Sequence, residues 1–327
     1  MLNILVTGGA GYIGSHTSLR LLEAGHNIVV LDNLYSGHRW AVSEEVAFYE
    51  GDIQDKQLVA DIIDKHEIEA VVHFAGHIVV PESVADPAKY YQNNVVGSLD
   101  LIETCIQKDV KHFIFSSSAA VYGIPSTATV DETVTLEPIN PYGKSKLMTE
   151  WTLQDLGFAA GDDFEFVALR YFNVAGAHSS GTLGQATPEA THLIKVACEA
   201  ACGKRNGMSI FGTDYDTPDG TCIRDYIHVE DLAEAHLDAL DYLFEGGKST
   251  IVNCGYGRGF SVKDVVKTVK EVSGSDFSVT MESRRAGDPP QLIADNSKIK
   301  KMFNWQSRFD DLETICRSAY EWEKSRG

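Results

Sequence analysis

The chain has 327 residues, 43% of them hydrophobic, so it can bury a large core as one α/β domain or as two closely packed ones. Its formal net charge of −19 argues against nucleic acid or an anionic membrane surface as a partner, because both would be repelled at long range. The six cysteines are scattered without a Cys-x-x-Cys pair, which is typical of reduced thiols and core packing rather than of disulfides or a metal site. With no apolar run of membrane-spanning length, we expect a cytoplasmic protein without a metal.

The first residues predict a strand, a glycine-rich turn and a helix. A short apolar run ends at Thr7, and apolar residues recur at helical spacing over residues 12–23. Between them, Gly8, Gly11 and Gly14 allow a tight turn and a close approach of the backbone to a pyrophosphate. The amides at the start of the helix would attract that phosphate. Taken alone, the glycines also fit a turn without any ligand.

The second predicted strand makes a bound dinucleotide the better interpretation. Residues 27–31 are mostly apolar and lead to Asp32, eighteen positions after Gly14, where a dinucleotide-binding fold has the acid that binds the adenosine ribose. The Asp32 carboxylate would repel a 2′-phosphate, and residues 33–36 contain no arginine to hold one. The sequence therefore favours NAD over NADP.

Two further strands extend this pattern. Residues 46–50 lead to Asp52, which is placed to bond an adenine amino group, to cap the helix expected at 55–65, or to do both. Residues 70–76 form a fourth strand that ends in a small-residue turn. The alternation of strands and helices predicts a doubly wound parallel sheet with its ligands at the carboxyl ends of the strands.

The next helix, expected at 88–108, carries more apolar residues than one face against a sheet requires. A second partner surface is implied, and a homodimer contact is the first candidate. Asn94 lies among these residues, and a polar position on a surface helix is the simple interpretation of it. A fifth strand at 110–118 then ends in three serines, and a loop over 119–141 leads into a helix that Pro141 opens.

Tyr142 and Lys146 lie one helical turn apart on this helix. A free phenol has a pKa of about 10 and is a poor base at neutral pH. A neighbouring ammonium and the positive charge of an oxidised nicotinamide are expected to lower that pKa. A serine from the adjacent strand end, such as Ser118, can then orient a substrate hydroxyl beside the phenolate. As an isolated motif, the pair would more simply be a solvated tyrosine and lysine on a helix surface.

Together these motifs resemble the extended short-chain dehydrogenase/reductase family, and within it the enzymes that invert C4 of a nucleotide sugar. The resemblance runs from end to end and is carried by several long segments, namely residues 7–16, 31–34, 73–76, 116–123, 142–146, 169–173, 224–229 and 284–288. It implies the transfer of a proton to Tyr142 and of the C4 hydride to NAD, then return of the hydride to the opposite face of a 4-keto intermediate. The cofactor would stay tightly bound because net redox is zero. The implied substrates are UDP-glucose and UDP-galactose.

The resemblance also assigns residues to the cofactor and to the substrate. It implies an NAD-binding Rossmann domain at 1–172 and a smaller mixed α/β substrate domain at 173–327, with residues 225–255 packing back onto the first. The catalytic residues would be Ser118, Tyr142 and Lys146. Besides Tyr142 and Lys146, the cofactor-binding residues would be Gly8, Gly11, Tyr12, Ile13, Gly14, Asp32, Asn33, Asp52, Ile53, Phe74, Ala75, Gly76, Asn94, Ser116, Tyr171 and Phe172.

For the substrate, Asn173, Arg224 and Arg285 would hold the diphosphate, because guanidinium groups bind phosphate oxygens bidentately. A glycine-rich and polar stretch at 176–189 would be a lid or substrate loop. Asp288 would bind the uridine ribose. The remaining substrate residues, besides Ser118 and Tyr142, would be Ser209, Ile210 and Phe211 at the uracil, with His192, Leu193 and Leu292 in the pocket.

The chain departs from the family pattern at three positions. Ile78 stands where a lysine helps to hold the cofactor, which puts one NAD contact in doubt, and His192 stands where a pocket asparagine is expected. Leu292 replaces a bulky tyrosine of members restricted to glucose and galactose. The smaller side chain predicts room for a 2-acetamido group, and hence action on UDP-N-acetylglucosamine and UDP-N-acetylgalactosamine as well.

Other activities fit the residues less well. A nucleotide-sugar 4,6-dehydratase would need an Asp-Glu pair where this chain has Ala119 and Ala120. A decarboxylase would need a further cation for a sugar carboxylate. A non-catalytic NAD sensor would usually lack Tyr142 or Lys146, and Asp32 disfavours a reductase with exchangeable NADPH.

Overall fold

Seven parallel strands form the central sheet of the protein. The computed structural model describes residues 1–187, 190–285 and 287–326. The strand order is β11-β7-β5-β4-β1-β2-β3. Strands β2 and β3 are added on one side of β1 and the later strands on the other, so the order of addition changes side between β1 and β4. The predicted doubly wound α/β fold is therefore confirmed. The strands span β1 Asn3–Thr7, β2 Asn27–Asp32, β3 Ala47–Glu50, β4 Ala70–His73, β5 His112–Ser118, β7 Glu165–Tyr171 and β11 Thr250–Cys254.

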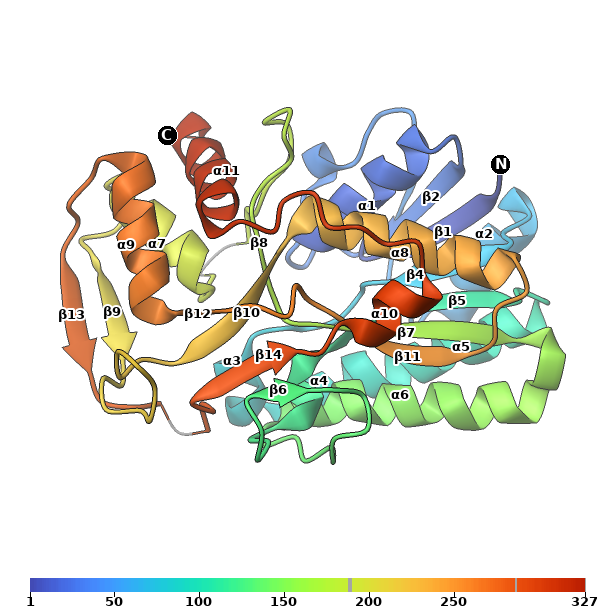
Figure 1. Cartoon of the computed structure of the whole chain (residues 1–327). Helices are drawn as coiled ribbons and strands as arrows, with labels where there is room; N and C mark the ends of the chain where they lie inside the picture. Colours follow the sequence, from blue (N-terminus) through green and yellow to red (C-terminus); the bar gives the residue numbers. More distant parts are fainter. Residues whose placement is uncertain (188–189, 286, 327) are drawn as a thin grey trace.

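Helices cover both faces of this sheet. Helices α1 (Tyr12–Glu23) and α8 (Val229–Phe244) pack on one face, while α2 (Lys56–His66), α5 (Gly97–Gln107) and α6 (Pro141–Ala160) cover the other. Figure 1 shows α8 and α6 on opposite sides of β7 and β11. Successive residues of β1 alternate between two cores, since Ile4 and Val6 belong to one cluster and Leu5 to the other. Burial on both faces explains why these strands are continuous apolar runs.

The helix expected at 88–108 is divided into three parts. It consists of α4 (Pro87–Tyr91), a π-helical turn η2 (Gln92–Val96) and α5, and the shorter α3 (Val80–Ala85) precedes it. Asn94, only 3% exposed, accepts a hydrogen bond from the His77 amide at 2.8 Å and donates to the His77 carbonyl at 2.9 Å. The prediction of one regular helix was wrong, and so was the simple interpretation of Asn94 as a surface position, whereas its predicted contact with the cofactor stays a prediction. The wider turn accompanies an asparagine that points inward to hold the chain after β4.

The second half of the chain builds a smaller part beside the sheet. It contains a second sheet of β12 (Gly259–Ser261), β10 (Ile223–His228), β14 (Gln291–Ala294) and β6 (Thr129–Val130), with β8 (Asn173–Ala175) paired to β10. A separate pair joins β9 (Met208–Phe211) to β13 (Val279–Glu282). The helices α7 (Leu193–Ala201), α9 (Val262–Ser273) and α11 (Leu312–Ser325) pack together around a third core, and α10 (Ser297–Met302) lies against β11.

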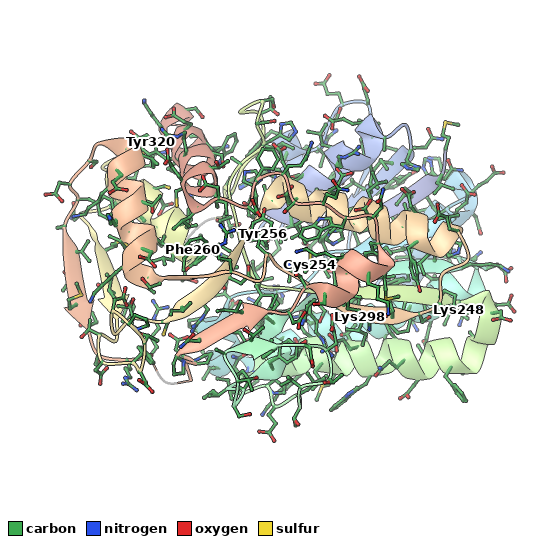
Figure 2. The ribbon with its side chains drawn as sticks, viewed as in Figure 1. Lys248, Cys254, Tyr256, Phe260, Lys298 and Tyr320 are labelled. Carbon is green, nitrogen blue, oxygen red and sulfur yellow. The ribbon has the colours of Figure 1, made fainter. Side chains whose placement is uncertain are left out.

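Residues 229–254 return to the large sheet, where β11 is an edge strand and α8 packs against α1. Figure 2 shows Lys248 at the outer end of this strand and Tyr256, just after the strand, near the middle of the molecule. There the Tyr256 hydroxyl donates to the buried carboxylate of Asp231 in α8, which also accepts the Arg308 and Phe309 amides. One carboxylate thus joins α8 to the segment before α11. Among the residues described, no helix is both long enough and apolar enough to cross a lipid bilayer.

Candidate active site

A cavity of about 400 Å³ runs along the carboxyl ends of the strands of the large sheet. This is where a doubly wound sheet binds its ligands. Most residues predicted for the cofactor and the substrate line this one cavity. They are Gly8, Gly11, Tyr12, Ile13, Gly14, Asp32, Asn33, Asp52, Ile53, Phe74, Ala75, Gly76, Ser116, Ser118, Tyr142, Lys146, Tyr171, Phe172, Asn173, His192, Arg224 and Leu292.

The glycine turn brings three backbone segments into close contact. Gly8 has a φ of 71°, and a Cβ there would lie 2.5 Å from the amide nitrogen of Ala75. A Cβ on Gly14 would lie 2.2 Å from the Gly8 carbonyl oxygen. Helix α1 begins at Tyr12, directly after Gly11, which has no side chain to cap it. The turn therefore leaves the first amides of α1 beside the cavity, where they suit a phosphate.

Two carboxylates follow β2 and β3. Asp32 is 8% exposed, and its oxygens accept the Ala10 amide at 2.9 Å and the Leu34 amide at 2.8 Å. Burial raises the pKa of Asp32, although both hydrogen bonds oppose the rise. Asp52 accepts a hydrogen bond from the Asn33 side chain at 3.0 Å. Its alternative role as the helix cap was wrong, because Asp55 accepts the capping bond of α2 from Leu58.

The start of α6 places the tyrosine and the lysine. Asn140 caps the helix by accepting the Gly143 amide at 2.8 Å, so Tyr142 lies in the first turn, beside the cavity. The Lys146 ammonium donates to the Ser116 carbonyl at 2.8 Å, and this lysine is only 4% exposed. Ser118 ends β5 and accepts the Ala120 amide at 3.2 Å. The strand end and the helix thus bring a hydroxyl, a phenol and an ammonium to one wall.

Burial dominates the pKa values of these groups. It raises the pKa of Tyr142 above its ordinary value, and a hydrogen bond with Ser118 opposes the rise. It lowers the pKa of Lys146 to about 8, against the charge of Glu150. The lowered phenol pKa expected from the sequence depends on the charge of an oxidised nicotinamide as well as on Lys146, and it stays a prediction.

The far end of the cavity is lined from the smaller part of the structure. Arg224 in β10 and Leu292 in β14 are direct neighbours in the paired strands. An Arg224 guanidinium nitrogen lies 3.7 Å from the carboxylate of Asp288. Nearby, the His192 ring nitrogen Nδ1 is 2.9 Å from the Gln185 amide nitrogen. The cation of Arg224, the amide of Asn173 and the apolar side chain of Leu292 therefore line the same cavity as Tyr142.

Seven predicted residues do not line this cavity. Asn94 holds the backbone of His77, and Leu193 lines a separate cavity of about 20 Å³ at the start of α7. The other five are in or near β9 and the segment after β13, and their roles stay predictions. They are Ser209, Ile210 and Phe211 in β9, Arg285, whose guanidinium lies 3.8 Å from the centre of the Phe211 ring, and Asp288. Ala286, in the same motif, and residues 188–189 of the predicted loop are outside the described residues.

Several lining residues were not predicted. The loop after Asp32 contributes Tyr35, Ser36 and Gly37, and its position after the ribose-binding acid was a signal that could have identified them. Ala120, two residues beyond Ser118, could have been found in the same way. Ile78 stands at the position where a cofactor-holding lysine was expected, and Gln185 and Thr187 belong to the stretch predicted as a lid or substrate loop. The other additions have no such signal, namely Leu31, Gly51, His77, Val80, Asn93 and Val174.

Comparison with known proteins agrees with this geometry. The profile of the "NAD dependent epimerase/dehydratase family" matches residues 4–255. The UDP-glucose 4-epimerase of Azospirillum brasilense is 54% identical, over 98% of this chain and 92% of that protein. The UDP-Glc/GlcNAc 4-epimerase structure from Campylobacter jejuni is 54% identical with a TM-score of 0.87, covering 99% of this chain and 100% of that one. The UDP-glucose 4-epimerase of Brucella ovis in complex with NAD is 45% identical with a TM-score of 0.96, covering 99% of both chains. The resemblance seen in the motifs is confirmed, and the chain belongs to the NAD dependent epimerase/dehydratase family.

Proposed function

We propose that this chain catalyses the reversible epimerisation of a UDP-hexose at C4, interconverting UDP-galactose and UDP-glucose with tightly bound NAD. The observation that carries this proposal is the continuity of the cavity. A single space joins the glycine turn and Asp32 to the Ser118–Tyr142–Lys146 wall and then to Asn173 and Arg224. The same activity is named for the relatives that cover nearly the whole chain.

The residues at the glycine turn fit NAD. Side chains at Gly8 and Gly14 would collide with the backbone that forms the turn, so this backbone can pack only with glycine there. Asp32 is held at the end of β2 by two backbone amides, where it can accept ribose hydroxyls and would repel a 2′-phosphate. When bound, NAD supplies a hydride acceptor that becomes a hydride donor in the return step.

The chain's own groups then handle the proton and the sugar. Ser118 and Tyr142 orient the 4-hydroxyl group, and the Tyr142 oxygen accepts its proton as the hydride leaves C4. The Lys146 ammonium favours the phenolate electrostatically. Arg224, with Asn173, holds the diphosphate, so the sugar can rotate while the nucleotide stays anchored.

We also propose a homodimer in the cytoplasm and a wider substrate range. Trp151 in α6 is 52% exposed and Val96, just before α5, is 39% exposed, so these neighbouring helices offer apolar surface to a second copy. Leu292 lines the cavity, and its side chain is smaller than a tyrosine and leaves room for a 2-acetamido group, which favours acceptance of UDP-N-acetylglucosamine and UDP-N-acetylgalactosamine.

The test is incubation of the purified protein, without added NAD, with UDP-galactose and separately with UDP-N-acetylgalactosamine, followed by chromatographic separation of the products. Formation of the glucose epimer supports the proposal, and the ratio of the two rates assigns a role to Leu292. If neither substrate yields a product even after NAD is supplied, the proposal is wrong.

A further inference from the structure

Two loops meet across the crevice of the sheet. Tyr35 follows β2, whereas Glu82 in α3 and Lys89 in α4 follow β4. Strands β2 and β4 flank β1 on opposite sides. Because Tyr35 on one side and His77 on the other line the same cavity, a contact between the two loops spans the end of β1 and its glycine turn.

The contact has three members. The Lys89 ammonium donates to the Tyr35 hydroxyl at 2.7 Å and lies 4.7 Å from the centre of its ring. The same hydroxyl is 3.4 Å from a Glu82 carboxylate oxygen, and Lys89 and Glu82 form an ion pair. The His77 ring packs edge to face on Tyr35 with the ring centres 4.7 Å apart. We call Tyr35, Glu82 and Lys89 the clasp.

The α3 side of the clasp is anchored in the core. The hydroxyl of Tyr90, which is 0% exposed, lies 2.9 Å from a Glu82 carboxylate oxygen and 2.6 Å from the Val79 carbonyl oxygen, and these two acceptors share its single proton. This buried tyrosine holds the carboxylate in place for Lys89 and Tyr35. The β4 side of the clasp is thus held by one fully buried residue, whereas Tyr35 on the β2 side is 59% exposed.

The β2 side is presented by the carboxylates proposed for NAD. The Tyr35 amide donates to the Asn33 side chain at 3.0 Å, and Asn33 donates to Asp52. Leu34 has a φ of 57°, and its amide is bonded to Asp32. A ligand that binds at Asp32 and Asp52 would thus order the turn that carries Tyr35.

We infer that the clasp closes over bound NAD and sets the rate at which NAD leaves the protein. The inference rests on the proposed function, because it concerns the same cofactor. The Glu82 and Lys89 side chains are 32% and 29% exposed, so each contact is in reach of water and weak enough to open reversibly. NAD leaves only while the clasp is open, and removing any member of the clasp speeds its departure. A retained cofactor suits a reaction in which NAD ends unchanged.

The test measures exchange of bound NAD for labelled NAD in solution, using the full-length protein and the variants Tyr35→Ala, Tyr35→Phe and Lys89→Met. We expect exchange about tenfold faster for Tyr35→Ala and about threefold faster for each of the other two. The phenol of Tyr35 and the ammonium of Lys89 contact each other. The double variant Tyr35→Phe/Lys89→Met should therefore increase the exchange rate by less than the product of the two single fold-increases.

Lys111→Met is the matched control. Lys111 forms an exposed ion pair with Asp163 at 3.2 Å, at the amino end of β5 and away from the cavity. Unchanged exchange in this variant, with faster exchange in the clasp variants, supports the inference. Wild-type exchange rates in Tyr35→Ala and Lys89→Met overturn it while leaving the proposed function intact. A wild-type protein that binds no NAD overturns both.

Discussion

Arg170 and Glu150 form a bidentate ion pair inside the protein, with Nε 2.9 Å from one carboxylate oxygen and Nη2 2.6 Å from the other. The two side chains are 3% and 1% exposed. Ser117 donates to the same carboxylate, and Arg170 also donates to the Tyr122 hydroxyl at 3.1 Å. The pair therefore joins α6, which carries the catalytic tyrosine and lysine, to the two strands whose ends form the wall beside them.

Replacing Arg170 with Met should lower the free energy of unfolding by about 3–5 kcal/mol, because Glu150 would remain buried without its cation. Urea denaturation followed by circular dichroism measures the change. The control is Arg317→Met in α11, where the partner Glu313 is an exposed neighbour one turn away and the expected change is below about 0.5 kcal/mol. Equal effects of the two substitutions would show that the buried pair is not a major source of stability.

Replacing Asp238 with Asn should stabilise the protein at alkaline pH. One carboxylate oxygen of Asp238 is buried without a hydrogen-bond partner among the described residues. Burial, with the charges of Glu234 and Asp241, raises the pKa of Asp238 from 3.8 to about 6. The folded-state pKa lies above the unfolded value, so the ionised carboxylate of Asp238 destabilises the folded protein. This destabilisation is fully present above pH 6 and disappears as the pH falls through 6 toward 4.

The substitution should therefore raise the free energy of unfolding by about 1 kcal/mol at pH 8 and by much less at pH 4.5. Urea denaturation at the two pH values checks the difference. Asp155→Asn, on the exposed surface of α6, is the control and should have little effect at either pH. A gain at pH 8 that persists undiminished at pH 4.5 would contradict the explanation.

Tyr142→Phe should lower kcat about 10³-fold, because the phenyl ring fills the same space but cannot accept the proton. The variant should still retain NAD through gel filtration. Tyr320→Phe is the matched control. Figure 2 shows Tyr320 at the outer edge of the smaller part of the structure. Removal of the Tyr320 hydroxyl should therefore leave turnover unchanged. Turnover by Tyr142→Phe near the wild-type rate would remove this tyrosine from the chemistry.

Leu292→Tyr should abolish activity on the N-acetylated substrates selectively. Leu292 is 8% exposed and lines the cavity beside Arg224, so a larger side chain there takes up space in the pocket. We expect at least about a tenfold fall in kcat/KM for UDP-N-acetylgalactosamine relative to UDP-galactose. An equal loss on both substrates would mean that position 292 does not select between them.

Local patterns in the sequence were enough to predict the framework of the fold. The first helix was expected at 12–23 and has those bounds, because apolar spacing and the glycine turn define it within a few residues. The parallel sheet followed from the alternation of apolar runs with helical segments. The π turn at 92–96 could not be predicted in this way, because Asn94 contacts His77 and Ser145, which are 17 and 51 positions away.

The candidate site likewise has features that local sequence predicts and features that it does not. Glycines, a strand-ending acid and a tyrosine one turn before a lysine have local signatures, and the structure brings them to one cavity. The pKa of Tyr142 could not be judged from sequence, because burial depends on every element packed around it. The clasp was missed for a similar reason, since Tyr35 is far from Lys89 along the chain.

Phe172 is the only residue between β7 of the large sheet and β8, which pairs with β10 of the second sheet. Its neighbours Tyr171 and Asn173 both line the cavity. The backbone therefore passes from one half of the molecule to the other at the reacting groups. A displacement of either sheet at this junction would therefore move residues on both sides of Phe172 that line the cavity.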